Sequence, residues 1–223
     1  MMSNGSAKQV ILAIVSILVI LASLCWIYFT QFASAKINVS LHTAVGQVMA
    51  EETDKLLGHK GEVIVLALDA GAAPELPAQL KSFKETLRKL GGVTIRKTDY
   101  LKTDNQPKYG TGRGLSARQF LRVVKKSAGA GAIVSFVGAP NLSDADFSEL
   151  EKNHPPKFIA EGGSAAKLKK LFDKKLLQVA IVHRYQFPAP NTNAPATPRE
   201  WFDKRFQILT SENAAMLPGQ PPD

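Results

Sequence analysis

Apolar and charged positions divide the chain into an N-terminal apolar run and a longer mixed segment. No Asp, Glu, Lys or Arg stands between Lys8 and Lys36, and residues 10–32 are almost all apolar. At about 1.5 Å per residue, a helix of about 23 residues exceeds the ~30 Å hydrocarbon layer of a bilayer. We therefore expect a short tail over residues 1–9 and a transmembrane helix over 10–32 that contacts membrane lipid.

A cleaved signal peptide is the alternative interpretation of this run. Ala33-Ser34-Ala35 resembles a signal-peptidase site, but the apolar core of a signal peptide is only about 7–15 residues long. The length therefore favours a retained anchor. Because Lys8 and the amino terminus together outweigh Lys36, the positive-inside rule favours a cytoplasmic N-terminus. We expect a single-pass protein of the cell (inner) membrane, with its C-terminal domain outside the cytoplasm.

Residues 36–58 carry the spacing of an amphipathic helix. Ile37, Leu41, Val45 and Val48 recur at intervals of three and four residues, and Gly58 ends the pattern. We expect the apolar side of this juxtamembrane helix to pack on the domain that follows. The alternative is pairing with a second copy of the chain, which would give a homodimer through residues 37–57.

From Gly61 onward, short apolar runs alternate with amphipathic segments. The runs predicted as strands are 63–68, 93–98, 132–137, 157–160 and 178–182, with a sixth at 205–210. Unbroken apolar strands joined by helices are typical of a parallel sheet covered on both faces. The half-polar 93–98 run suits an edge, as in the flavodoxin-like order 2-1-3-4-5. We therefore predict an α/β fold: one Rossmann-like, three-layer domain over 61–210 with a mostly parallel sheet of five to six strands.

Size, charge and cysteine content add three constraints. The 223 residues, less the anchor and a tail over 211–223 expected to be disordered, suffice for one domain. The single cysteine, Cys25, lies in the apolar run, so the domain contains no disulfide. The formal charge is +9, and residues 81–126 hold 13 Lys and Arg against 3 Asp and Glu, a net +10.

That basic stretch predicts a surface for an anionic or protein partner of the cell envelope. The side chains chosen as candidates are Arg113, Arg118, Arg122, Lys125 and Lys126. A merely solvated helix face is the plainer interpretation. Nucleic acid is disfavoured, because single-strand readers interleave aromatic platforms and this stretch has few.

Polar residues after the predicted strands mark the other candidate site. The carboxyl ends of parallel strands meet at one edge of the sheet, where ligands bind in this fold class. The loops there hold Tyr100, Asp104, Glu161 and Tyr185 among others. We choose five as ligand-crevice candidates: Asp69, Asn141, Ser164, His183 and Arg184.

No catalytic, cofactor-binding or metal-ligating set emerges. Ser164 and Lys167 have the Ser-x-x-Lys spacing of penicillin-binding enzymes, but the companion motifs are absent. Asp69, Ser164 and His183 could meet as a triad, yet no Gly-x-Ser-x-Gly elbow is present. The four histidines are scattered, without zinc-site spacing. A hydrolase is therefore the third-ranked function.

The runs VIVLALDAG, AIVSFVGAP and QVAIVHR, each followed by a helix or loop, resemble one lobe of a type I periplasmic sugar-binding protein over residues 61–210. Members of that family clamp a solute between two lobes, and this chain has one. We expect a membrane-anchored, non-catalytic binding or scaffolding domain of the cell envelope. The alternative that the resemblance implies is a small-solute sensor built like half a binding protein.

Overall fold

The structure is a computed structural model that describes residues 4–28, 37–69, 73–101, 115–184, 195–214 and 217. It contains two compact units, Met1–Ile37 and Asn38–Asp223. The first unit holds helix α1 (Asn4–Ile27), and within it residues Gln9–Ile27 are long and apolar enough to cross a membrane. Residues 9–28 are all exposed. Residues 29–32 of the predicted span lie outside the described residues.

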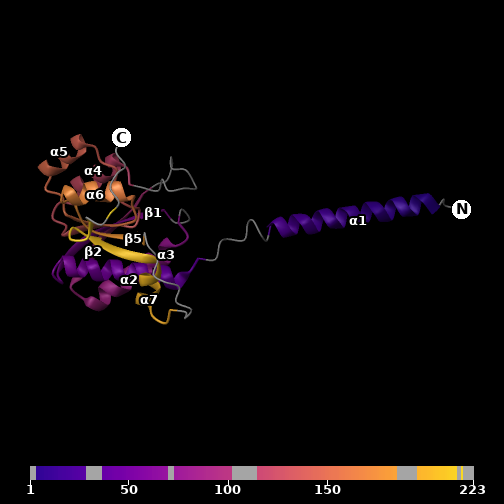
Figure 1. Ribbon diagram of the computed structural model, residues 1–223, viewed down its shortest axis with the longest axis horizontal. Coiled ribbons are helices and arrows are strands. Elements are labelled where there is room, and N and C mark those ends of the chain that lie inside the picture. Colours follow the sequence, from indigo (N-terminus) through magenta and orange to yellow (C-terminus); the bar gives the residue numbers. More distant parts are fainter. Residues whose placement is uncertain are drawn as a thin grey trace. The chain divides into compact units, whose positions relative to one another are not determined.

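The second unit is built on one six-stranded sheet, with the order β2-β1-β3-β4-β5-β6 (Figure 1). The strands are β1 (Gly61–Leu68), β2 (Val93–Leu101), β3 (Ala132–Ser135), β4 (Lys157–Glu161), β5 (Leu177–His183) and β6 (Phe206–Thr210). Neighbouring strands are parallel except β5 and β6, which are antiparallel. The predicted fold class, the sheet order and the edge position of the half-polar strand are confirmed.

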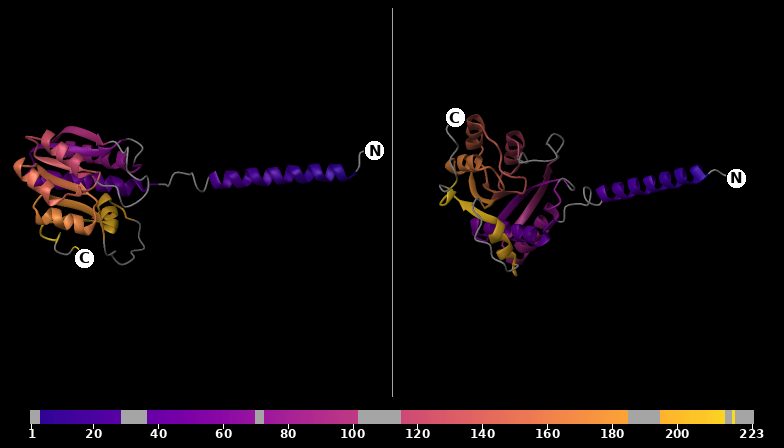
Figure 2. Two further views of the ribbon diagram at one scale, coloured as in Figure 1. Left: turned by 90° about the horizontal axis from the view of Figure 1, so that it is seen from above. Right: turned by 45° about the vertical axis from the view of Figure 1, so that its right-hand side comes forward.

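Helices cover both faces of the sheet, which gives three layers (Figures 1 and 2). One layer contains α2 (Val39–Leu56), α3 (Leu76–Leu90) and α7 (Pro198–Arg205), with α2 packed against the other two. The opposite layer contains α4 (Ala117–Lys126), α5 (Asp144–Lys152) and α6 (Ala165–Asp173). This division follows from the strand order, because the chain reverses direction across the sheet after β2.

The core lies between the sheet and these two layers. Strand β3 is buried along its whole length, and so are the last six residues of β1. On the α4 side, the rings of Phe120 and Phe158 lie 4.9 Å apart, and on the α3 side the ring of Phe83 meets that of Phe136 edge-on at 5.4 Å. Such aromatic pairs contribute beyond the area they bury.

The apolar face of α2 belongs to this core. Ala44, Val45, Val48 and Met49 are at most 2% exposed. Gly46 lies so close to α3 that a Cβ built on it would stand 2.1 Å from the carbonyl oxygen of Gln79. The face expected to pack on the domain does so, and a homodimer would have to use another surface.

Several boundaries differ from the prediction for local reasons. Strand β2 continues to Leu101 because its ladder with β1 extends to the pair Leu68 and Leu101. Strand β3 stops at Ser135, whose hydroxyl donates to the carbonyl of Gly138 and accepts from the Val137 N–H, forming a turn. In the segment expected to be a disordered tail, Ala214 and Leu217 are each only 5% exposed and belong to the core. The apolar run 214–217 is only four residues long and is followed by a proline- and glycine-rich end, so the sequence does not reveal this packing.

Candidate functional site

A cavity of about 600 Å³ lies at the carboxyl ends of β1, β3, β4 and β5. This is the edge of the sheet where the sequence places its ligand-crevice candidates. Apolar side chains from the strands and the loop after β3 form much of its wall, and they include Leu68, Phe136, Ile181 and Phe206. The polar groups of the lining include Glu75, Gln79, Glu161, Ser164, Lys167 and His183. An apolar wall with a few converging polar groups is typical of a site for a small molecule.

Glu161 and Gln79 form the polar contact at the centre of this lining. Glu161 ends β4, Gln79 lies in the first turns of α3, and the Gln79 side-chain Nε2 donates a 2.7 Å hydrogen bond to Glu161 Oε1. Removal from water raises the pKa of Glu161 to about 8, with Glu75 adding to the rise and the bond from Gln79 opposing it. Near neutral pH this side chain is therefore a neutral acid.

Helix α2 brings a histidine to the same cluster. The Nδ1 atom of His42 stands 3.4 Å from Gln79 Nε2, so the Gln79 amide lies between a ring nitrogen and a carboxyl group. Burial lowers the pKa of His42, partly offset by the nearby Glu75, and His183 lowers it further. Three elements that are distant in sequence, α2, α3 and β4, thus meet at one amide.

The loop after β4 exposes a hydroxyl beside this cluster. Gly162 and Gly163 have positive φ angles of 80° and 143°, which glycine adopts without strain. The turn leads to Ser164, which occupies the N-cap position of α6 but makes no capping hydrogen bond with its side chain. Ser116 and Ser143 both close capping boxes at α4 and α5. The Ser164 hydroxyl is therefore exposed and uncommitted where it lines the cavity.

Two of the five crevice candidates line the cavity and three do not. Ser164 and His183 both line the cavity, and the His183 ring stacks on Phe206 with 4.4 Å between centroids. Asp69, Asn141 and Arg184 are not part of the lining.

Asn141 and Arg184 have structural contacts outside the cavity. Asn141 pairs with Ser116 in an isolated bridge. Arg184 donates from Nε to the Asp203 carbonyl at 2.6 Å, which fastens the end of β5 to α7.

The cavity lining separates the two catalytic alternatives. Ser164 and Lys167, the Ser-x-x-Lys pair, both line it, whereas Asp69 of the possible triad does not. Across the described parts of the chain, no three His, Cys, Asp or Glu residues gather in a way that could hold a metal ion.

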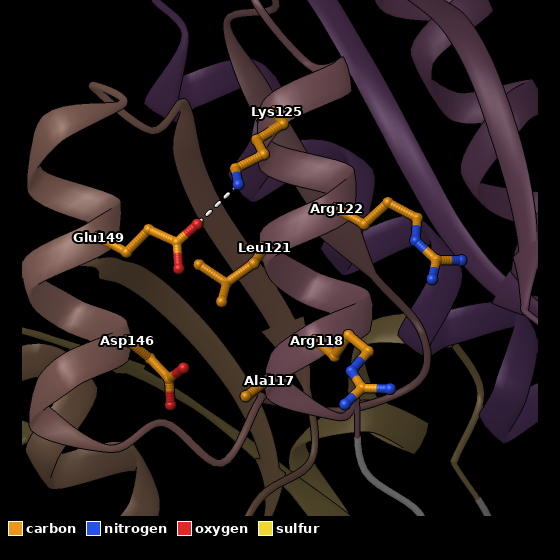
Figure 3. Close-up of a pocket in the computed structure, with 7 residues that line it drawn as sticks. All are labelled: Ala117, Arg118, Leu121, Arg122, Lys125, Asp146 and Glu149. Carbon is orange, nitrogen blue, oxygen red and sulfur yellow. Dashed lines mark ion pairs between the residues drawn. The ribbon is translucent and has the colours of Figure 1, made fainter.

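A second hollow of about 540 Å³ lies between α4 and α5 (Figure 3). Arg118, Arg122 and Lys125 line it on the α4 side, facing Asp146 and Glu149 of α5. Lys125 pairs with Glu149 at 2.7 Å, whereas the two arginine side chains extend away from α5.

Not all of the predicted anion-binding residues share this hollow. Lys126 is exposed on α4 but does not line it, and Arg113 lies outside the described residues. The sequence-contiguous basic stretch is also divided by the fold, since α3 and α4 cover opposite faces of the sheet (Figure 1). An anion-binding role for the α4 surface stays a prediction.

Sequence reasoning missed the centre of the cavity. Glu161 was recognised only as one of several loop residues, and Gln79, Glu75 and His42 were not singled out. The available signal was chemical: Glu161 directly follows the apolar residues Phe158, Ile159 and Ala160. A carboxyl group at the end of a buried strand requires a partner, because a desolvated charge without one is costly.

Comparison with family models and with curated proteins finds no match to this chain. Comparison with solved structures finds similar folds. An arabinose binding protein from Geobacillus stearothermophilus aligns with a TM-score of 0.53 and 14% identity, over 80% of this chain and 63% of the other. A sugar-binding protein of a sugar ABC transporter from Bacillus halodurans aligns with a TM-score of 0.53 and 14% identity, over 79% of this chain and 64% of the other.

A glucose-galactose binding protein from Geobacillus stearothermophilus gives a TM-score of 0.50 and 10% identity, over 77% of this chain and 61% of the other. The chain thus spans less than two thirds of the length of each of these proteins. At such low identity the likeness shows the fold: a Rossmann-like lobe of the kind found in periplasmic sugar-binding proteins. The resemblance seen in the sequence is confirmed at this level.

Proposed function

We propose that this chain is a membrane-tethered, non-catalytic domain that binds a small hydroxylated solute in the strand-end cavity, outside the cytoplasm. The observation that carries the proposal is the cavity itself, whose wall combines apolar side chains with the Glu161–Gln79 pair and four further polar residues. A neutral acid, an amide and a free hydroxyl can each donate and accept hydrogen bonds. The hydroxyl groups of a sugar or polyol likewise both donate and accept hydrogen bonds.

The fold supports the same proposal. Ligands of open α/β sheets bind outside the carboxyl ends of the strands, which is where the cavity lies. The structural neighbours described above bind arabinose, or glucose and galactose, by their names. Because this chain spans only 61–64% of their lengths, a second copy or a partner would close over the open side of the site.

Solute binding is expected to raise the melting temperature of the full-length protein in detergent. Screening monosaccharides and polyols by thermal shift should identify at least one that stabilises the wild type, since a ligand of the native state stabilises it by mass action. The variant Ser164→Phe fills the cavity mouth from an exposed position and should lose that stabilisation.

Ser148→Phe, on the exposed surface of α5, is the matched control, because Ser148 does not line the cavity. It should respond to the solute as the wild type does. Failure of the whole panel to stabilise the wild type would contradict the proposal, as would an equal response from Ser164→Phe.

Whether α1 is a retained membrane anchor can be tested separately. If α1 is a retained anchor, the protein stays in the membrane pellet after carbonate extraction, and its intact mass includes residues 1–35. A chain that begins at Lys36 and is recovered in the supernatant would instead identify a cleaved signal peptide, for which Ala33-Ser34-Ala35 provides the site.

A further inference from the structure

The inference concerns the charge of the solute, and it rests on the proposed function of the strand-end cavity. Glu161 Oε1 accepts the hydrogen bond from Gln79, and none of the ion pairs among the described residues involves Glu161. The second oxygen, Oε2, has no described hydrogen bond. Among the described residues, Asp54 Oδ1 is the only fully buried side-chain nitrogen or oxygen atom without a hydrogen-bond partner. Glu161 Oε2 therefore retains some exposed surface, and the residue that carries it lines the cavity.

An acid at this position has one capability that an amide lacks. A glutamine at residue 161 could accept the same hydrogen bond from Gln79 without the cost of a desolvated ionisable group. A carboxyl group can also release its proton when a cation arrives, and it then forms a charge-assisted hydrogen bond about twice as strong as a neutral one. The raised pKa of Glu161, about 8, is the expected property of a desolvated carboxyl group that has no cation beside it.

The charged and titratable groups around Glu161 come from four elements. Glu75, at the start of α3, is close enough to raise the pKa of Glu161, so a second carboxyl group lies near this side of the cavity. His42 of α2 has a pKa below its ordinary value and is neutral at pH 7. His183 lies at the end of β5. Lys167 lines the cavity from α6 and makes no described ion pair with Glu161.

We propose that the solute carries a protonated amine beside its hydroxyl groups, and that the amine pairs with Glu161 at the Gln79 side of the cavity. On binding, the Glu161 proton passes to solvent and the ammonium group donates to the carboxylate. No covalent bond forms or breaks other than this O–H bond. Gln79 is a positioning residue, because its amide holds Oε1 and leaves Oε2 toward the solute.

Matched pairs of sugars that differ in one group test this pairing. Glucosamine against glucose, and galactosamine against galactose, should be titrated into the full-length protein in detergent by calorimetry at pH 6.5. At least one amino sugar should bind at least tenfold more tightly than its parent sugar. Repeating the titration in two buffers of different ionisation enthalpy should show release of about one proton per site.

The variant Glu161→Gln retains the size and the hydrogen-bond acceptor, so it should bind both members of a pair equally and release no proton. Glu151→Gln, at an exposed position on α5 outside the cavity lining, should behave as the wild type does. Equal or tighter binding of the parent sugar by the wild type would overturn the inference and leave the proposed function standing. Retention of the amine preference in Glu161→Gln would also overturn it. No binding of any member, together with an unresponsive solute panel, would overturn both.

Discussion

Replacing Gly46 with alanine is expected to lower the free energy of unfolding by roughly 1–3 kcal/mol, the usual range for overpacking a core. The new Cβ would stand 2.1 Å from the carbonyl oxygen of Gln79 and 2.9 Å from its carbonyl carbon, far inside contact distance. Both atoms belong to the α3 backbone, so relief requires the two helices to separate. Urea denaturation followed by circular dichroism measures the change.

The higher helix propensity of alanine would by itself raise the stability of this variant, which is the opposite of the expected result. Alanine is favoured over glycine in a helix interior by about 1 kcal/mol, so a variant without a clash would gain stability. Ser40→Ala, at an exposed position on the same helix, is the control and should change stability little. A Gly46→Ala protein as stable as the wild type would mean that α2 and α3 are not in this close contact. Because Gln79 positions Glu161, the variant should also bind solute more weakly.

The stability of the wild type is expected to fall as the pH rises from 6.5 to about 8, and Glu161→Gln should remove much of that fall. In the folded protein the pKa of Glu161 is raised to about 8, against an ordinary value of 4.5. Between these values the folded state holds a proton that the unfolded state has lost. The free energy of unfolding then decreases with pH by up to about 1.4 kcal/mol per unit.

His42 acts in the opposite direction at the low end of this window. Its folded pKa is lowered from 6.5, so near pH 6.5 the unfolded state binds more protons at this residue and stability rises with pH. The difference between the wild type and Glu161→Gln cancels this contribution, because both proteins contain His42. Chemical denaturation at several pH values between 6.5 and 8.5 gives the slope for each protein. Glu151→Gln should keep the wild-type slope. Identical slopes for the wild type and Glu161→Gln would contradict a largely desolvated, neutral Glu161.

The sheet could be predicted from the sequence because each strand is a local signal. Val63–Leu68 and Ala132–Val137 read as unbroken apolar runs, and a strand buried on both faces has no other pattern. The half-polar strand from Val93 indicated an edge for the same reason. The capping boxes at Ser116 and Ser143 are local as well, because each joins a serine to the residue three positions further on.

The centre of the cavity could not be predicted, because its contacts join distant parts of the chain. Gln79 and Glu161 are 82 residues apart, and Gln79 and His42 are 37 apart. Gln79 lies on the apolar side of α3, where the helical spacing indicates burial but not the partner side chains in α2 and β4. The close approach at Gly46 that places it is likewise a property of two packed helices. The basic stretch is likewise divided by the fold, since α3 and α4 cover opposite faces of the sheet (Figure 1).

One calorimetric titration can decide whether the strand-end cavity binds a small solute. The solute that gives the largest thermal stabilisation should be titrated into full-length wild type, Ser164→Phe and Ser148→Phe under the same conditions. We expect saturable binding at one site per chain for the wild type and Ser148→Phe, and none for Ser164→Phe. Equal binding by all three proteins would contradict this expectation, because the solute would then be held somewhere other than this cavity.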